Sequence, residues 1–213
     1  MIITREKILV AIPAYDSRME ISCVSGLMQC IPYYERPFFW CGMSNIALAR
    51  NEIAHIFVEQ FTQYDWIMMI DSDTGFTTDD WNLLWEGDEE IVCAEYSRKM
   101  LGEPPVQFGL GFTRVHRNVF ERIKKLMHED GSERVNRFYH KGKMMVDYFP
   151  NGAIQSGRWI GEDQGFFMWA ALTEATLRIE TRTHLNHVGR FEFGYPDQVK
   201  GYVIKGSDED GAQ

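Results

Sequence analysis

The fold of this chain is indicated first by one stretch, Ile67-Met68-Met69-Ile70-Asp71-Ser72-Asp73. A continuous apolar run of this length is typical of a strand buried on both faces of a sheet. Asp71 and Asp73 follow it directly, so we expect two carboxylates close together at the carboxyl edge of that sheet. Like charges this close raise one another's pKa, and a bound cation such as Mg²⁺ or Mn²⁺ relieves the repulsion. The alternative is a strand that ends in an Asx-type turn.

The composition indicates a globular domain rather than a nucleic-acid-binding or membrane-spanning protein. Of 213 residues, 45% are hydrophobic, and 31 acidic residues against 22 basic ones give a formal net charge of −9. This acidic balance disfavours a groove that follows a nucleic-acid backbone. No apolar segment reaches 18 residues and the N-terminus does not resemble a signal peptide, so we expect no membrane span. The expected location is cytoplasmic, in the host cytoplasm if the protein is viral.

The cysteines and the C-terminus refine this picture. Cys23, Cys30, Cys41 and Cys93 are scattered without a C-x-x-C pair, which favours reduced core thiols over a disulfide or zinc framework. We expect one domain over residues 1–205. Residues 206–213 form a small, acidic segment that reads as a flexible tail or the start of a linker to further domains.

Strand and helix patterns alternate along the chain, which predicts an α/β domain with a mixed, mainly parallel sheet flanked by helices. A first strand over 7–13 is expected to end at Pro13, because proline cannot donate to a sheet ladder. Ser17 has capping-box spacing for a helix over 17–30, and Ser44 is expected to cap the next helix. Residues 31–43 and 130–142 read as loops. Further strands are expected at 91–94, 113–116, 144–149 and 177–181, and helices from 78, 118 and 159.

Three places are candidates for contacts with a nucleotide. The turn Pro13-Ala14-Tyr15-Asp16 follows the first strand, where open α/β sheets bind nucleotides. Tyr15 could stack on a base and Asp16 could accept from a base or a ribose, although a rim aromatic and a helix cap explain them equally well. Arg50 could reach a phosphate or a base, and Arg98 follows a strand where a diphosphate would lie. An ordinary surface arginine and a solvated turn are the alternatives.

Two later features are candidates for chemistry. Glu162 and Asp163 open an apolar helix, where acids commonly complement the helix dipole. A carboxylate there, beside Trp159 and facing a cleft, is also well placed to act as a base. His187 lies in a predicted loop, where it is either structural or a third metal ligand.

With these pieces in order, the sequence resembles the GT-A fold of nucleotide-sugar glycosyltransferases, close to family-2-like enzymes from bacteria and large DNA viruses. The matching segments are Ile12-Pro13-Ala14-Tyr15, Ala49-Arg50-Asn51, Asp71-Ser72-Asp73, Gly109-Leu110-Gly111-Phe112, Trp159-Ile160-Gly161-Glu162-Asp163 and His187-Val188-Gly189. The length and acidic tail also resemble the N-terminal module of chlorovirus enzymes that glycosylate the major capsid protein. Each motif alone is weak, and their order is more specific.

The resemblance implies a Rossmann-like GT-A domain that transfers a sugar from a nucleoside-diphosphate sugar, a UDP-sugar, with Mn²⁺ or Mg²⁺ bound. It implies that Asp73 binds the metal, that Asp71 holds the ribose or a metal-bound water, and that His187 completes the metal site. The nucleotide site would comprise Pro13, Ala14, Tyr15, Asp16, Arg50, Asp71, Ser72, Asp73 and Arg98. Asp163 of the Glu162-Asp163 pair would be the base of an inverting reaction on a hydroxyl of a glycan or glycoprotein, a viral capsid protein among the candidates.

Two alternatives remain open at the level of the sequence. A nucleotidyltransferase acting on sugar phosphates also uses paired carboxylates and a metal, but such enzymes usually carry a glycine-rich signature with Arg or Lys where this chain has the turn 13–16. A non-catalytic module that binds a nucleotide-sugar and a metal is the second. The segment after Asp163 is unusually apolar, so the sequence names no residues that contact the acceptor.

Overall fold

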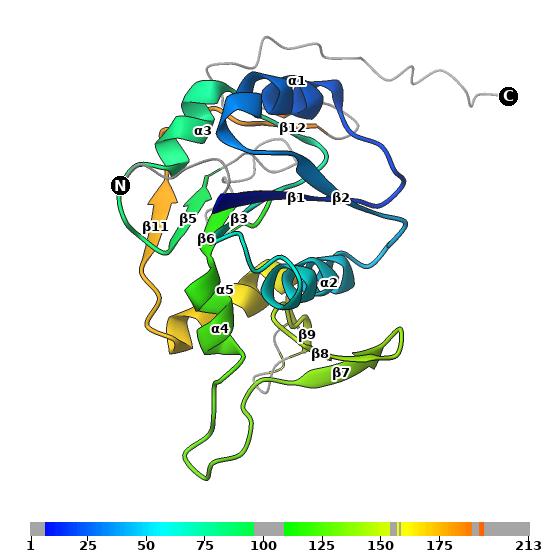
Figure 1. Ribbon diagram of the computed structural model, residues 1–213, viewed down its shortest axis with the longest axis vertical. Helices are drawn as coiled ribbons and strands as arrows, with labels where there is room; N and C mark the ends of the chain where they lie inside the picture. The colour runs from blue at the N-terminus through cyan, green and yellow to red at the C-terminus, as the bar shows by residue number, and fades with distance from the viewer. Residues whose placement is uncertain (1–6, 96–108, 154–156, 158, 189–191, 194–213) are drawn as a thin grey trace, which may run out of the picture.

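The computed structural model describes residues 7–95, 109–153, 157, 159–188 and 192–193 (Figure 1). The predictions for Arg98, for Gly189 and for the tail 206–213 lie outside the described residues. Within the described part, no helix is both long and apolar enough to cross a lipid bilayer.

A six-stranded sheet forms the centre of the molecule, in the order β11-β5-β6-β3-β1-β2. Its strands are β1 (Ile8–Ala14), β2 (Pro37–Cys41), β3 (Trp66–Ile70), β5 (Ile91–Ala94), β6 (Phe112–His116) and β11 (Leu177–Glu180). β1 pairs in parallel with β2 and β3, and β5 pairs in parallel with β11. β6 lies between β3 and β5 and is antiparallel to both. The predicted mixed, mainly parallel α/β sheet flanked by helices is therefore confirmed.

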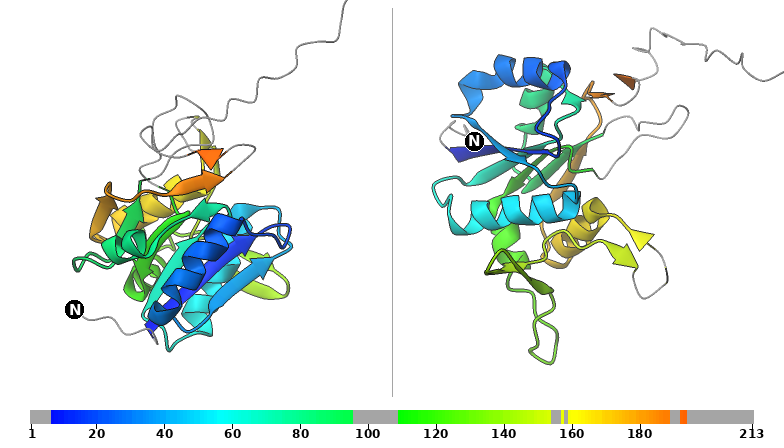
Figure 2. Two further views of the ribbon diagram at one scale, coloured as in Figure 1. Left: turned by 90° about the horizontal axis from the view of Figure 1, so that it is seen from above. Right: turned by 90° about the vertical axis from the view of Figure 1, so that its right-hand side faces the viewer.

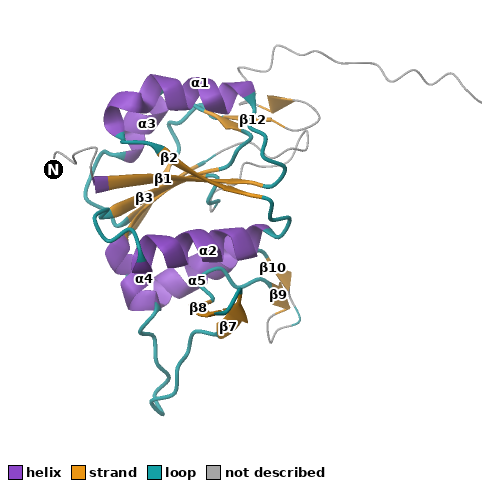
Figure 3. Ribbon diagram, turned by 45° about the vertical axis from the view of Figure 1, so that its right-hand side comes forward, coloured by secondary structure: helices purple, strands orange, loops and turns teal. Residues whose placement is uncertain are grey.

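Helices cover both faces of this sheet. α1 (Ile21–Cys30) and α3 (Thr78–Leu84) lie on one face, and α2 (Ile46–Glu59), α4 (Arg117–Ile123) and α5 (Glu162–Leu172) lie on the other (Figure 3). The right-hand view in Figure 2 shows the same separation. The smaller elements are a 3₁₀ turn η2 (Ile31–Tyr33), the sheet of β4 (Thr74–Gly75), β12 (Asn186–Val188) and β13 (Glu192–Phe193), the hairpin β7 (Arg137–His140) and β8 (Lys143–Val146), and the pair β9 (Gly152–Ala153) and β10 (Trp159–Ile160).

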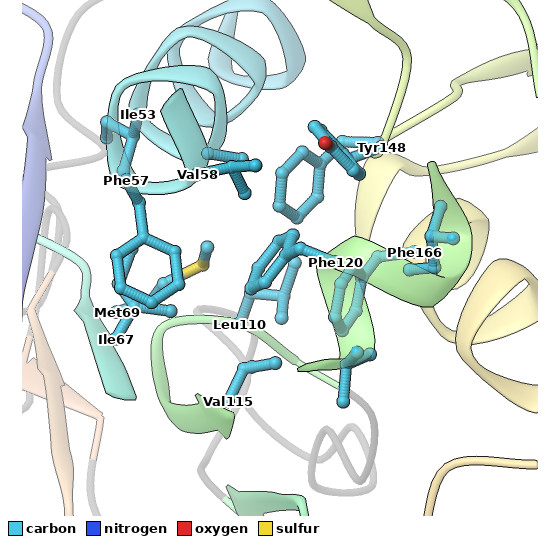
Figure 4. Packing of buried hydrophobic residues seen from close by; sticks show 14 of the residues in the cluster. Ile53, Phe57, Val58, Ile67, Met69, Leu110, Val115, Phe120, Tyr148 and Phe166 are labelled. Atoms are coloured by element: carbon cyan, nitrogen blue, oxygen red, sulfur yellow. The ribbon is translucent and has the colours of Figure 1, made fainter. Parts of the chain in front are cut away.

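The central strands are apolar throughout because their side chains alternate between two buried cores. In β3, Ile67 and Met69 join the core under α2, α4 and α5, whereas Met68 and Ile70 join the core under α1 and α3. In the first of these cores the ring of Phe120 lies 5.8 Å from Phe57, 5.4 Å from Tyr148 and 5.6 Å from Phe166, between centroids (Figure 4). This aromatic cluster ties α2, α4 and α5 together.

The predicted start of the first helix is wrong. Ser17 does not cap it but has a left-handed backbone, with φ 61°, and its N–H donates to the carbonyl of Ala14 at 3.2 Å. The helix begins at Ile21, where the N–H of Glu20 donates to the carbonyl of Ser72 at 2.9 Å. A contact with the D-x-D turn, distant in sequence, thus takes the place of the local capping box. The next helix is capped by Asn45, which accepts from the N–H of Leu48 at 3.0 Å, and not by Ser44.

The segments predicted as loops contain strands. β2 falls within 31–43, and its Phe38 and Trp40 pack against the core. β1 runs through Pro13 to Ala14, because by Pro13 its pairing with β3 has ended and only β2 remains alongside. β7 falls within 130–142, where alternating exposure hides the apolar signal.

Other boundaries shift by a few residues. Helix α5 starts at Glu162, and Trp159 belongs to β10. The predicted strand 144–149 is β8, which ends at Val146. Of the cysteines, Cys23, Cys30 and Cys93 are buried as expected, whereas Cys41 at the end of β2 is exposed.

Candidate active site

The D-x-D segment forms a tight turn at the carboxyl edge of the sheet. The N–H of Thr74 donates to the carbonyl of Asp71 at 3.0 Å, which closes a four-residue turn directly after β3. The carbonyl of Asp73 accepts from the N–H of Val188 in β12 at 2.8 Å. Together with the hydrogen bond from Glu20 to Ser72, this contact binds the backbone of the turn to the segment before α1 and to β12. The carboxylates of Asp71 and Asp73 are therefore available to other partners.

Those two carboxylates have different partners. Asp71 accepts from Nη2 of Arg50 at 2.8 Å, on the side of α2. Oδ1 of Asp73 lies 3.4 Å from Nε2 of His187, on the side of β12. The buried guanidinium of Arg50 thus balances the charge of Asp71, while Asp73 faces the imidazole of His187.

Arg50 lies at the centre of an acidic cluster. Its side chain is only 3% exposed, and Nη1 donates to Oε1 of Glu162 at 2.8 Å and to Oδ1 of Asp163. The surface-arginine alternative is thereby excluded. The structure brings the D-x-D segment and the Glu162-Asp163 pair together through this one guanidinium. Three carboxylates around one cation leave a net negative site at the sheet edge.

The environment makes Asp163 an unusually basic carboxylate. Burial raises its pKa to about 6, and the nearby charges of Glu162 and Asp71 act in the same direction, while Arg50 and a backbone hydrogen bond from Leu110 oppose them. A general base is most effective when its pKa lies close to the working pH. The side chain keeps 24% exposure, so the carboxylate is open to an incoming group.

Two close contacts fix the position of α5. Asn51, next to Arg50 on α2, accepts from the N–H groups of Tyr148 at 2.8 Å and Phe149 at 3.2 Å, and donates to Asp147 at 2.9 Å. Gly165 in the second turn of α5 lies against Pro150, since a Cβ added there would be 1.9 Å from the Pro150 carbonyl oxygen. The segment 147–150, held by Asn51, therefore supports the helix that carries Asp163.

A polar cavity of about 330 Å³ opens beside Asp73. It is lined by Asp16, Arg18, Met19, Glu20, Ser72, Asp73 and Val188. Predicted nucleotide-site residues Asp16, Ser72 and Asp73 thus share one cavity. Pro13 and Ala14 lie buried in β1, and Tyr15 is 63% exposed beside the same strand end.

Asp73 and His187 can serve as two ligands of a divalent cation. A carboxylate with an imidazole suits a transition metal such as Mn²⁺ better than Mg²⁺, which prefers oxygen ligands alone. In the described part of the chain, no group of three or more His, Cys, Asp and Glu side chains is arranged to hold a metal. The remaining positions would therefore fall to water and to phosphate oxygens of a substrate, as is common where metals bind with nucleotides.

Three site residues were missed from the sequence. Arg18, 85% exposed at the cavity, sits 3.7 Å from Asp16 and places a positive charge where phosphates would lie. Its position just after the first strand was the available signal. Asn51 and Leu110 lie in motifs that carry the family resemblance, but no role could be assigned to them, because both act through contacts with segments far along the chain.

Comparison with known proteins supports the fold. No protein-family model and no curated protein sequence matches the chain. Among solved structures, A197 from STIV superposes with a TM-score of 0.55 at 16% identity, over 86% of each chain. A glycosyltransferase involved in the glycosylation of the major capsid of PBCV-1 gives a TM-score of 0.34 at 17% identity, over 53% of this chain and 62% of that one.

A third structure, a putative glucose-1-phosphate thymidylyltransferase from Bacillus anthracis in complex with a sucrose, gives a TM-score of 0.41 at 11% identity, over 84% of this chain and 89% of that one. The likeness to A197 shows a shared fold. The likenesses to the two transferases are too distant to bear on function.

Proposed function

We propose that this chain is a metal-dependent glycosyltransferase that moves a sugar from a nucleoside-diphosphate sugar to an acceptor hydroxyl, with inversion. One observation carries the proposal. Asp71 of the D-x-D turn and the Glu162-Asp163 pair, about ninety residues apart, meet on Arg50 at the carboxyl edge of the sheet. Open α/β sheets bind their ligands at this edge.

The cavity beside Asp73 is where the nucleoside diphosphate would bind. Its volume of about 330 Å³ is within the range of about 300–1,000 Å³ typical of ligand pockets. Asp16 would accept from the base or ribose, and the exposed Arg18 would contact the diphosphate. A Mn²⁺ ion held by Asp73 and His187 would supply positive charge against the departing diphosphate. We infer uridine as the base from the family resemblance.

Asp163 would remove the proton from the acceptor hydroxyl as it attacks the sugar. With its pKa raised to about 6, Asp163 is more basic than an ordinary carboxylate and is still mostly ionised at neutral pH, so it can accept a proton. Arg50 would hold the carboxylate in place and prevent it from becoming neutral, because a nearby cation favours the charged form. Glu162, on the same guanidinium nitrogen, would share this orienting role.

The acceptor is proposed as a hydroxyl of a glycan or glycoprotein, including a viral capsid protein, in the cytoplasm of the producing cell. This part of the proposal is supported by the resemblance of the motifs and by the acidic charge of the chain, which disfavours nucleic acid as the acceptor.

The experiment is incubation of the purified protein with a panel of nucleotide-sugars and Mn²⁺, with released nucleoside diphosphate as the readout. We expect at least one UDP-sugar to yield UDP, faster with an added saccharide acceptor, and EDTA to abolish the release. Asp163→Asn should bind the same donor but release UDP roughly 10²–10⁴-fold more slowly. Formation of pyrophosphate from a nucleoside triphosphate and a sugar phosphate would instead identify a nucleotidyltransferase. Donor binding with no release in any condition would refute an enzymatic role.

A further inference from the structure

A second cavity lies between α2 and the β7–β8 hairpin, away from the candidate active site. The hairpin lies beneath α2, on the face of the sheet opposite α1 (Figure 1). The cavity has a volume of about 220 Å³ and shares no lining residue with the cavity beside Asp73. Its wall combines the apolar groups of Trp40, Ile56 and Met145 with several charged and polar side chains.

The acid in this cavity, Glu52, is already neutralised by the protein. Its side chain is 7% exposed, and its oxygens accept from Nε1 of Trp40 at 2.6 Å and pair with Nζ of Lys141 at 2.9 Å. Nε2 of His140 lies 2.9 Å from the same carboxylate. A buried carboxylate that accepts from Trp40 and pairs with Lys141 has little left to offer a ligand, so the charge that faces the cavity is not that of Glu52.

The hairpin turn holds Lys141 in this arrangement. Lys141 and Gly142 have φ values of 47° and 79°, which is the left-handed pair that a two-residue hairpin turn uses. Such a backbone is uncommon for a residue with a side chain. The turn places Nζ of Lys141 5.6 Å from the centroid of the Trp40 ring, beside Glu52. The turn thus keeps one positive charge fixed at the rim.

Three further polar side chains line the cavity. His55, Gln60 and Lys143 make no side-chain hydrogen bond or ion pair with any other residue that the structure describes. With Lys141 balanced by Glu52, the ammonium of Lys143 gives the cavity a net positive charge, in a chain whose net charge is −9. Lys143 and Gln60 are exposed and His55 is half-buried, so all three are accessible to a ligand in the cavity. A ligand pocket typically combines an apolar wall with a few polar groups of this kind.

We propose that this cavity binds a monosaccharide-sized organic anion, a sugar phosphate or a sugar acid. The charged group lies at Lys143, with His55 and Gln60 as further donors, and the carbon framework packs on Trp40, Ile56 and Met145. The volume of about 220 Å³ is below the range of about 300–1,000 Å³ typical of drug-sized ligands, so a single ring fits and a nucleotide does not. The proposal does not rest on the glycosyltransferase function.

The test is titration of the ¹⁵N-labelled full chain, followed by amide chemical shifts, with glucose 6-phosphate, glucuronate, inorganic phosphate and uncharged glucose. We expect glucose 6-phosphate or glucuronate to shift amides of α2 and of the β7–β8 hairpin, with a Kd of about 1 mM or lower. The two charged sugars distinguish a phosphate from a carboxylate as the preferred group. Glucose and inorganic phosphate should each bind at least several-fold more weakly.

A matched pair of variants tests the role of the ammonium group. Lys143→Gln should weaken binding roughly ten-fold, which corresponds to about 1.4 kcal/mol, because the charged hydrogen bond to the ligand is lost. Lys125→Gln, at another exposed lysine outside the cavity, should leave binding within about two-fold. The proposal would be overturned if the two substitutions had equal effects, or if neither charged sugar gave localised shifts. It would also be overturned if glucose or inorganic phosphate bound as tightly as the better-bound charged sugar.

Discussion

Replacement of Arg50 by methionine tests the acidic cluster directly. The guanidinium is 3% exposed and contacts the carboxylates of Asp71, Glu162 and Asp163. Removal of one partner of a buried ion pair typically costs about 3–5 kcal/mol, because the remaining charge stays buried without compensation. We therefore expect Arg50→Met to lower the free energy of unfolding by about 3–5 kcal/mol at pH 8. That is a large share of the roughly 5–15 kcal/mol of an ordinary domain.

The loss should depend on pH. A carboxyl group whose pKa is raised on folding favours the folded state most below its unfolded pKa, and this contribution is lost as pH rises through its folded pKa. For Asp163 that window runs from 3.8 to about 6 in the native protein, which corresponds to about 3 kcal/mol. Without Arg50, which lowers this pKa, the window extends upward. The destabilisation by Arg50→Met should therefore be smaller at pH 5 than at pH 8.

The assay is urea unfolding followed by tryptophan fluorescence at both pH values. Arg18→Met is the control, because Arg18 is 85% exposed and pairs only weakly with Asp16, at 3.7 Å. It should cost less than about 1 kcal/mol at either pH. Arg50→Lys, which keeps the charge but not the planar fork, should fall between wild type and Arg50→Met. A loss for Arg50→Met that matched the control, or that did not shrink at pH 5, would refute the description of this cluster.

Three further predictions concern the same site. Asp163→Asn removes one buried charge from the cluster, so it should raise the midpoint of thermal unfolding at pH 8 and change it less at pH 5. Wild-type turnover should fall as pH drops below about 6, because the base must be ionised, and a turnover rate that rose below pH 6 would contradict its role. Calorimetry should show that Asp73→Asn abolishes Mn²⁺-dependent donor binding while Asp71→Asn weakens it less, since only Asp73 lies beside His187. Equal losses of donor affinity in the two variants would indicate a metal shared by both aspartates. Gly165→Ala should destabilise the protein by about 1–3 kcal/mol or more in urea unfolding, because its Cβ would lie 1.9 Å from the carbonyl oxygen of Pro150. Gly161→Ala, whose Cβ would meet no atom of the described residues within 4 Å, should cost less than about 1 kcal/mol.

The sequence was informative where local pattern and final structure agree. The apolar runs that become β1, β3 and β5 are buried on both faces, so no partner is needed to recognise them as central strands. Pro13 misled the prediction of a strand end, because a proline is tolerated where one neighbour of a strand has already left the sheet. Ser17 gave a wrong prediction for the start of the first helix, because the contact from Glu20 to Ser72 decides where α1 begins.

The sequence identified residues of the candidate site but not the contacts among them. Asp71, Asp163 and Arg50 were each singled out by residue type and position, but the distances that join them depend on how α2, β3 and α5 pack. The pairing of Asp71 with Arg50 follows from the burial of one face of α2. Arg50 lay one step off the apolar stripe of that helix, and a stripe pattern does not tell which neighbouring polar residue will be covered.

Arg50 and Asn51 are adjacent on α2, yet every partner named for them beyond Asp71 lies 96 or more residues further along the chain. Contacts of such long separation close large loops, and their entropy cost delays them in folding. We expect the acidic cluster to assemble late, after the sheet has formed. In a nascent or truncated chain that ends before α5, Arg50 would have only Asp71 of its three acidic partners. The site can therefore form only when the chain from α2 to α5 is complete.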